Sequence, residues 1–187
     1  AFMLRLGPMT FITTQSELDT YVKTIRGARV IFLDTEFMRE RTYYAQLCVV
    51  QAKITGGDPV AIDALSDDLE LMPFWDAIMD PAMIKVFHSG KQDLEIIYQA
   101  TGAVPTPLFD TQIAASVLGH GEQAGFETLA REILHHQLDK GSQFTDWARR
   151  PLTDRQLTYA LGDVLYLEPI YDALVAQLAE KGRESWV

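Results

Sequence analysis

The chain has 187 residues, 48% of them hydrophobic, and a formal net charge of −10 at pH 7. A chain of this length can bury about 70% of the surface that its unfolded form exposes, so one domain with a large core needs no disulfides. The negative charge argues against nucleic-acid binding over the whole surface, because such affinity comes mainly from Lys and Arg; any groove for nucleic acid would have to be local.

The single cysteine indicates a reducing compartment. Cys48 lies in the apolar run QLCVVQ, where a buried free thiol is expected. No stretch approaches the roughly 18 uninterrupted apolar residues that span a bilayer, and the N-terminus has no apolar segment followed by a small-residue cleavage site. We therefore expect a soluble, cytoplasmic protein with no membrane partner. Residues 1–9 are set aside as a tag remnant or a disordered start, and one domain is predicted over residues 10–187.

Strand patterns dominate the first half of the chain. A short strand at 10–13 precedes a helix to about residue 26, whose start has the capping-box spacing of Thr14 and Glu17. β-branched and apolar runs predict three neighbouring strands, at 29–37 (RVIFLDTEF), 45–52 (AQLCVVQA) and 59–63 (PVAID). The pattern then predicts a helix at 69–79, a strand at 83–88 and a helix at 90–101.

Beyond residue 107 the pattern becomes helical, at 111–118, at 126–134 and from 153 to about 181. No internal repeat, low-complexity tract or linker interrupts the chain. The sequence therefore predicts a single α/β domain with a helical second half, and it leaves the strand order open.

Two acids stand near the end of the predicted strand at 29–37. Asp34 and Glu36 are two residues apart, so both carboxylates leave one face of the strand while Thr35 points the other way. Acids placed together at a buried strand end repel each other unless a cation neutralises them, and oxygen ligands favour Mg²⁺ or Mn²⁺ over Zn²⁺. The alternative is a solvated strand end, which the preceding apolar run VIFL disfavours.

Three later residues extend this pattern. Asp93 falls on the first turn of the helix at 90–101, where the helix dipole alone accounts for an acid. Tyr159 and Asp163 are four residues apart and share one face of the last helix. Tyr159 could also be a half-buried core tyrosine, whereas Asp163 lies among apolar neighbours and needs a partner.

Together these segments resemble the ribonuclease D family of DEDD-type 3′→5′ exonucleases, in the subclass whose last motif carries a tyrosine. FLDTEF is similar to the first exonuclease motif of that family, HSGKQDLEIIY to the second and YALGDVLYL to the third. RTYYAQLCVVQ, FDTQIAASVLG and TDWARRPLTDRQL resemble family stretches outside the motifs, so the resemblance spans about residues 11–178.

The resemblance implies a ribonuclease H-like mixed sheet flanked by helices, and hydrolysis assisted by two divalent cations, Mg²⁺ or Mn²⁺. The expected substrates are single-stranded RNA 3′ ends, trimmed to nucleoside 5′-monophosphates, as in tRNA or other structured RNA. Asp34 would bridge both cations, Glu36 and Asp163 would complete the water-activating site, Asp93 would hold the second cation, and Tyr159 would hydrogen-bond the attacking water.

Substrate contacts are expected from Thr35, Phe37, His88 and Gln46. His88 and Asp93 also have the spacing of the last motif in the histidine-type subclass, but they lie in the middle of the chain. His88 is therefore expected to support or face the substrate site, or to be a hydrogen-bonded structural histidine. Four aromatic side chains could stack bases or could equally be core: Phe37, Tyr43, Tyr44 and Trp147. Five basic side chains near the motifs could contact the substrate or be solvated surface: Arg39, Arg41, Lys91, Arg149 and Arg150.

Ribonuclease D proteins carry helical nucleic-acid-binding repeats after the nuclease domain, and this sequence has none, which implies a fragment or a short form. The alternatives are the same chemistry on DNA 3′ ends or short oligonucleotides, a non-catalytic nucleic-acid-binding domain, and an unrelated α/β enzyme with structural acids. The oligomeric state stays open.

Overall fold

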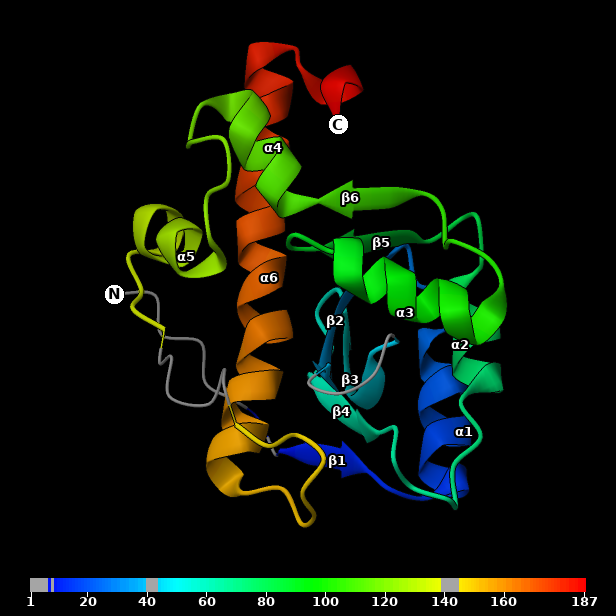
Figure 1. Cartoon of the computed structure of the whole chain (residues 1–187). Coiled ribbons are helices and arrows are strands. Elements are labelled where there is room, and N and C mark those ends of the chain that lie inside the picture. Colours follow the sequence, from blue (N-terminus) through cyan, green and yellow to red (C-terminus); the bar gives the residue numbers. More distant parts are fainter. Residues whose placement is uncertain (1–6, 8, 40–43, 139–144) are drawn as a thin grey trace.

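A six-stranded mixed sheet forms the centre of the computed structural model, which describes residues 7, 9–39, 44–138 and 145–187 (Figure 1). The strand order is β1-β4-β3-β2-β5-β6. β3 pairs antiparallel with β2 and β4, and the other pairs are parallel. The strands are β1 (Thr10–Ile12), β2 (Val30–Met38), β3 (Gln46–Ile54), β4 (Val60–Asp63), β5 (Ile84–Phe87) and β6 (Leu108–Asp110).

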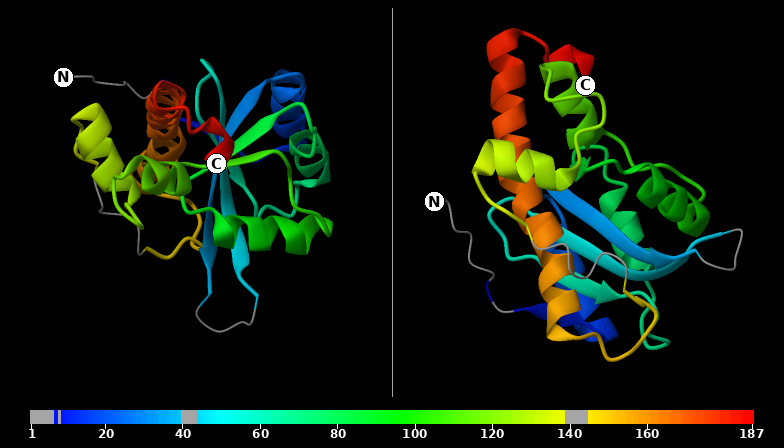
Figure 2. Two further views of the ribbon diagram at one scale, coloured as in Figure 1. Left: turned by 90° about the horizontal axis from the view of Figure 1, so that it is seen from above. Right: turned by 60° about the vertical axis from the view of Figure 1, so that its left-hand side comes forward.

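Helices cover both faces of this sheet. One face is covered by α1, α2 and α3, and the other by α6, against which α4 and α5 also pack (Figures 1 and 2). The helices are α1 (Gln15–Ile25), α2 (Met72–Ile78), α3 (Lys91–Thr101), α4 (Thr111–Leu118), α5 (Phe126–Leu134) and α6 (Asp154–Lys181), followed by a short 3-10 helix, η1 (Glu184–Trp186).

The alternation of side chains along β2 decides where its acids lie. Ile31 and Leu33 belong to the core under α1 and α2, whereas Phe32 packs against Val164 and Leu167 of α6. Because successive side chains of a strand leave opposite faces, Asp34 follows Phe32 toward α6. The central strand therefore carries its acids into the layer between the sheet and α6.

The strands predicted at 29–37, 45–52 and 59–63 were expected to be neighbours, and this is confirmed, since β2, β3 and β4 are adjacent in the sheet. No element is predicted at residues 108–110, where the structure has the short edge strand β6. With only three residues directly after Pro107, this strand is too short to show an alternating pattern. The helix predicted at 69–79 begins at Met72. Residues 1–6 and 8 of the predicted disordered start lie outside the described residues.

In the part of the chain that the structure describes, no helix combines the length and the apolar character needed to cross a membrane.

Candidate active site

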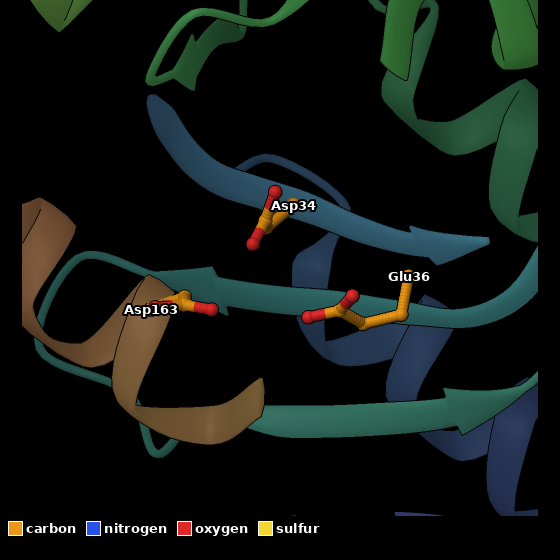
Figure 3. A group of neighbouring side chains, drawn as sticks. All are labelled: Asp34, Glu36 and Asp163. Carbon is orange, nitrogen blue, oxygen red and sulfur yellow. The ribbon is translucent and has the colours of Figure 1, made fainter. Parts of the chain in front are cut away.

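Three carboxylates from two elements converge between the sheet and α6. Asp34 and Glu36 extend from β2 and Asp163 from α6, and their side chains point toward one another (Figure 3). One oxygen of each carboxylate lies within 4.8 Å of an oxygen of the other two. Residues separated by more than 120 positions thus form one cluster of oxygen ligands.

The electrostatics of this cluster are unfavourable without a cation. Burial, followed by the charges of Asp93, Asp163 and Glu36, raises the pKa of Asp34 well above its usual value. Burial and the neighbouring Asp163 raise the pKa of Glu36 to about 9, and burial raises the pKa of Asp163 to about 8, against a hydrogen bond with Asp34. Oxygen-only ligands that repel one another fit hard divalent cations, so the cluster implies bound divalent metal ions.

Asp93 approaches from the other side of β2. It lies in the first turn of α3, is 7% exposed, and accepts a hydrogen bond of 2.5 Å from the Thr35 hydroxyl to its Oδ1. Burial raises the pKa of Asp93, and the Thr35 hydrogen bonds oppose that shift. Asp93 is not one of the three clustered acids, but its charge acts on both Asp34 and Glu36.

Thr35 therefore has a definite role in the described structure. Its side chain is 6% exposed and its hydroxyl donates to Asp93, on the face of β2 opposite Asp34. This leaves only the Thr35 backbone for the substrate contact that the sequence predicts.

Tyr159 lies one helical turn before Asp163 on α6. Burial raises the pKa of its phenol, and the charges of Asp163, Glu36 and Asp34 add to the shift. The hydroxyl group consequently stays protonated at neutral pH and faces the same acids.

A cleft of about 830 Å³ opens onto the acids, lined among others by Asp34, His88, Tyr159 and Asp163. The His88 ring contacts Phe126 at 5.3 Å between centroids, and its Nδ1 lies 2.9 Å from the Thr111 hydroxyl. Burial lowers the pKa of His88 to about 4, so the ring is neutral at pH 7. His88 thus has a structural partner and still lines the cleft.

Other expected substrate contacts lie elsewhere. Phe37 is half-buried and Gln46 is exposed, and neither is among the residues that line this cleft. Gln46 pairs with Met38 toward the far end of the β2–β3 ladder. Tyr43 and Arg41 lie outside the described residues.

Two further candidates for substrate contact occupy structural positions. Trp147 is 2% exposed and packs in a core cluster with Leu161, so it cannot stack on a base. The Arg150 guanidinium donates hydrogen bonds of 2.7 to 3.1 Å from Nε and Nη2 to the Asp63 carboxylate, and Nη2 also donates to the carbonyl of Cys48. It is an ion-paired structural group and not a free phosphate ligand.

Two acids near the site, Glu127 and Asp110, are absent from the residues predicted from the sequence. Glu127, in the first turn of α5, lines the cleft, and its charge raises the pKa of both Asp163 and Tyr159. Asp110 caps α4, and its carboxylate also accepts hydrogen bonds from the backbone of Ser89 and Gly90, ahead of Asp93 on α3. Only Asp110 had a local cue, because Asp directly before a helix is a preferred N-cap.

A mixed sheet with helices on both faces and a half-buried cluster of acids that fits divalent cations defines a metal-dependent enzyme of the ribonuclease H-like class. A family model described as 3′-5′ exonuclease matches residues 9–179. Ribonuclease D of Jannaschia sp. (strain CCS1) is 50% identical over 179 residues, which cover 94% of this chain and 46% of that protein.

Two solved structures agree with that match. Escherichia coli RNase D, described as an exoribonuclease involved in structured RNA processing, has a TM-score of 0.87 at 39% identity and covers 92% of this chain and 46% of its own. Brucella melitensis NrnC bound to pGG has a TM-score of 0.79 at 28% identity and covers 95% of this chain and 86% of its own. Another structure of NrnC has bound Mg²⁺.

The chain belongs to the 3′-5′ exonuclease family, in its ribonuclease D branch, as the three motifs predict. The predicted ribonuclease H-like fold is confirmed. The chain spans about half the length of the curated ribonuclease D relatives that it matches.

Proposed function

We propose that this domain hydrolyses RNA from the 3′ end, one nucleoside 5′-monophosphate at a time, with two divalent cations, Mg²⁺ or Mn²⁺. The observation that carries the proposal is the convergence of Asp34, Glu36 and Asp163 on one spot beside an open cleft. When bound, the cations would lower the pKa of the attacking water and stabilise the leaving 3′ oxygen.

The side chains divide this work according to their positions. Asp34 is central to the acid cluster and would ligate both cations, while Glu36 and Asp163 would complete the site of the attacking water. Asp93 would hold the second cation, with Thr35 fixing its carboxylate. Burial, with the charges of the neighbouring acids, raises the pKa of the Tyr159 phenol in the metal-free domain, and its hydroxyl would orient the attacking water by a hydrogen bond.

The substrate class rests on the relatives. RNase D of Escherichia coli is described as an exoribonuclease involved in structured RNA processing, and we extend that substrate, including tRNA 3′ ends, to this domain. NrnC was solved with the dinucleotide pGG, which supports short oligonucleotides as the second candidate substrate. DNA 3′ ends remain the third, because discrimination by the 2′-hydroxyl needs only one or two contacts. We also propose a cytoplasmic location, consistent with the free buried thiol of Cys48.

The test is a 5′-labelled single-stranded RNA incubated with Mg²⁺ or Mn²⁺. We expect a ladder of products that shorten by one nucleotide, and a chelator should abolish it. The Asp34→Asn variant should fold and give no ladder, because the charge shared by both cation sites is gone. Products cut internally, or a ladder that persists in the chelator, would refute the proposal. Parallel assays with DNA and dinucleotides rank the three substrates.

A further inference from the structure

The glutamine at position 51, in the middle of β3, has no role in the fold or in the proposed reaction. The Gln51 side chain is fully buried, and neither its amide nitrogen nor its amide oxygen has a hydrogen-bond partner in the described part of the chain. Buried polar groups are nearly always hydrogen-bonded, and an orphaned one destabilises the fold. Because the unpartnered amide destabilises the metal-free fold, we expect it to gain a hydrogen-bond partner in the active, metal-bound state.

The pairing of β2 with β3 places this amide beside the acids. Gln51 lies directly opposite Asp34 in the antiparallel ladder. Side chains opposite each other in such a pair project to the same face, with Cβ atoms about 4.5–5.5 Å apart. The same face of β3 carries Val49, which packs against α6, and Lys53, which forms an ion pair with Glu168 of α6. Gln51 thus lies between the sheet and α6, in the layer that Asp34 enters.

We propose that Gln51 is a positioning residue for the metal site: when a divalent cation is bound, its amide N–H donates to the Asp34 carboxylate and holds that carboxylate in the ligating position. The inference rests on the proposed function. A carboxylate has about four lone-pair positions, so Asp34 can accept from an amide while it ligates a cation. Donors behind metal ligands commonly change metal affinity by about 10–100-fold when removed.

The experiment measures Mn²⁺ binding to the wild type and to Gln51→Met, by titration calorimetry or by the electron paramagnetic resonance spectrum of free Mn²⁺. Methionine has nearly the same size and no amide. We expect the Mn²⁺ dissociation constant to rise by about 10–100-fold. The melting temperature in chelator should stay the same or rise by a few degrees, because an unpartnered polar group has been removed.

A matched control is Gln156→Met, at the second buried glutamine. The Gln156 side chain makes hydrogen bonds with Thr153, Thr145 and the Asp146 carbonyl at the start of α6. This variant should melt at a lower temperature and bind Mn²⁺ within twofold of the wild type. Gln51→Met should lose Mn²⁺ affinity and keep its melting temperature, whereas Gln156→Met should do the reverse. This contrast distinguishes a positioning role from a purely structural one.

Three results would overturn the inference or its basis. Mn²⁺ affinity of Gln51→Met within twofold of the wild type would refute the inference alone. A melting temperature in chelator well below that of the wild type would show that the amide has a structural partner, such as a buried water, and would also refute it. A wild type that binds no Mn²⁺ would refute the proposed function itself. If Gln51→Met does not fold, Gln51→Asn, whose amide is one methylene shorter, should show the same loss of affinity.

Discussion

Replacing an acid of the site should stabilise the metal-free protein. In Asp163→Asn the charge disappears and the shape is retained. Burial raises the pKa of Asp163 from 3.8 to about 8, so the folded state binds a proton that the unfolded state has released. For an acid with a raised pKa, stability is lost as the pH rises from the unfolded to the folded value. Wild-type stability in chelator should therefore fall between about pH 4 and pH 8.

The size of this destabilisation at pH 7 follows from the distance between the unfolded-state pKa and that pH. From pKa 3.8 to pH 7, at 1.36 kcal/mol per unit, the acid destabilises the metal-free fold by at most on the order of 4 kcal/mol. The asparagine amide is also desolvated, so we expect a net gain of about 2 kcal/mol, or roughly 4–8 °C in Tm for a domain of this size.

The assay is thermal unfolding in chelator at pH 5 and at pH 8. Asp163→Asn should melt above the wild type at pH 8, and the difference should shrink at pH 5. The control is Asp63→Asn, which breaks the ion pair with Arg150 and should melt below the wild type. An Asp163→Asn protein that melts at or below the wild-type temperature at pH 8 would refute the idea that the buried charge of Asp163 destabilises the fold until a cation binds.

Three further variants test single parts of the site. Tyr159→Phe should lower the single-turnover rate roughly 10²-fold while Mn²⁺ affinity stays within twofold; a loss of Mn²⁺ binding would contradict an orienting role. Thr35→Val removes the donor to Asp93 and should weaken Mn²⁺ binding about 10-fold in calorimetric titration; unchanged affinity would show that the hydrogen bond is dispensable. Arg150→Met should lower the unfolding free energy in urea by about 3 kcal/mol without weakening RNA binding, and weaker RNA binding at unchanged stability would contradict its structural assignment.

The sequence predicted those parts of the site that local rules control. Period-two alternation places Asp34 and Glu36 on one face of a strand, and helical spacing places Tyr159 and Asp163 on one face of α6. The apolar run before Asp34 distinguishes a buried strand end from a solvated one. These rules need only a few neighbouring residues, which is why they held without a structure.

Contacts between distant segments were beyond such rules. Thr35 and Asp93 are 58 residues apart, and Arg150 and Asp63 are 87 apart, so neither partner is visible from its own motif. Arg150 in the run ARRP was only a candidate for substrate contact, because exposed and ion-paired arginines share the same local pattern. The orphaned amide of Gln51 is likewise visible only once β2 and β3 are in register.

The most direct measurement is anomalous diffraction from crystals soaked in Mn²⁺. We predict anomalous peaks about 2.0–2.6 Å from carboxylate oxygens of Asp34, Glu36 and Asp163, with the second cation on the Asp93 side of Asp34. A cleft without anomalous density at saturating Mn²⁺, or manganese bound only at other acids of the surface, would contradict the assignment of this cluster as a catalytic metal centre.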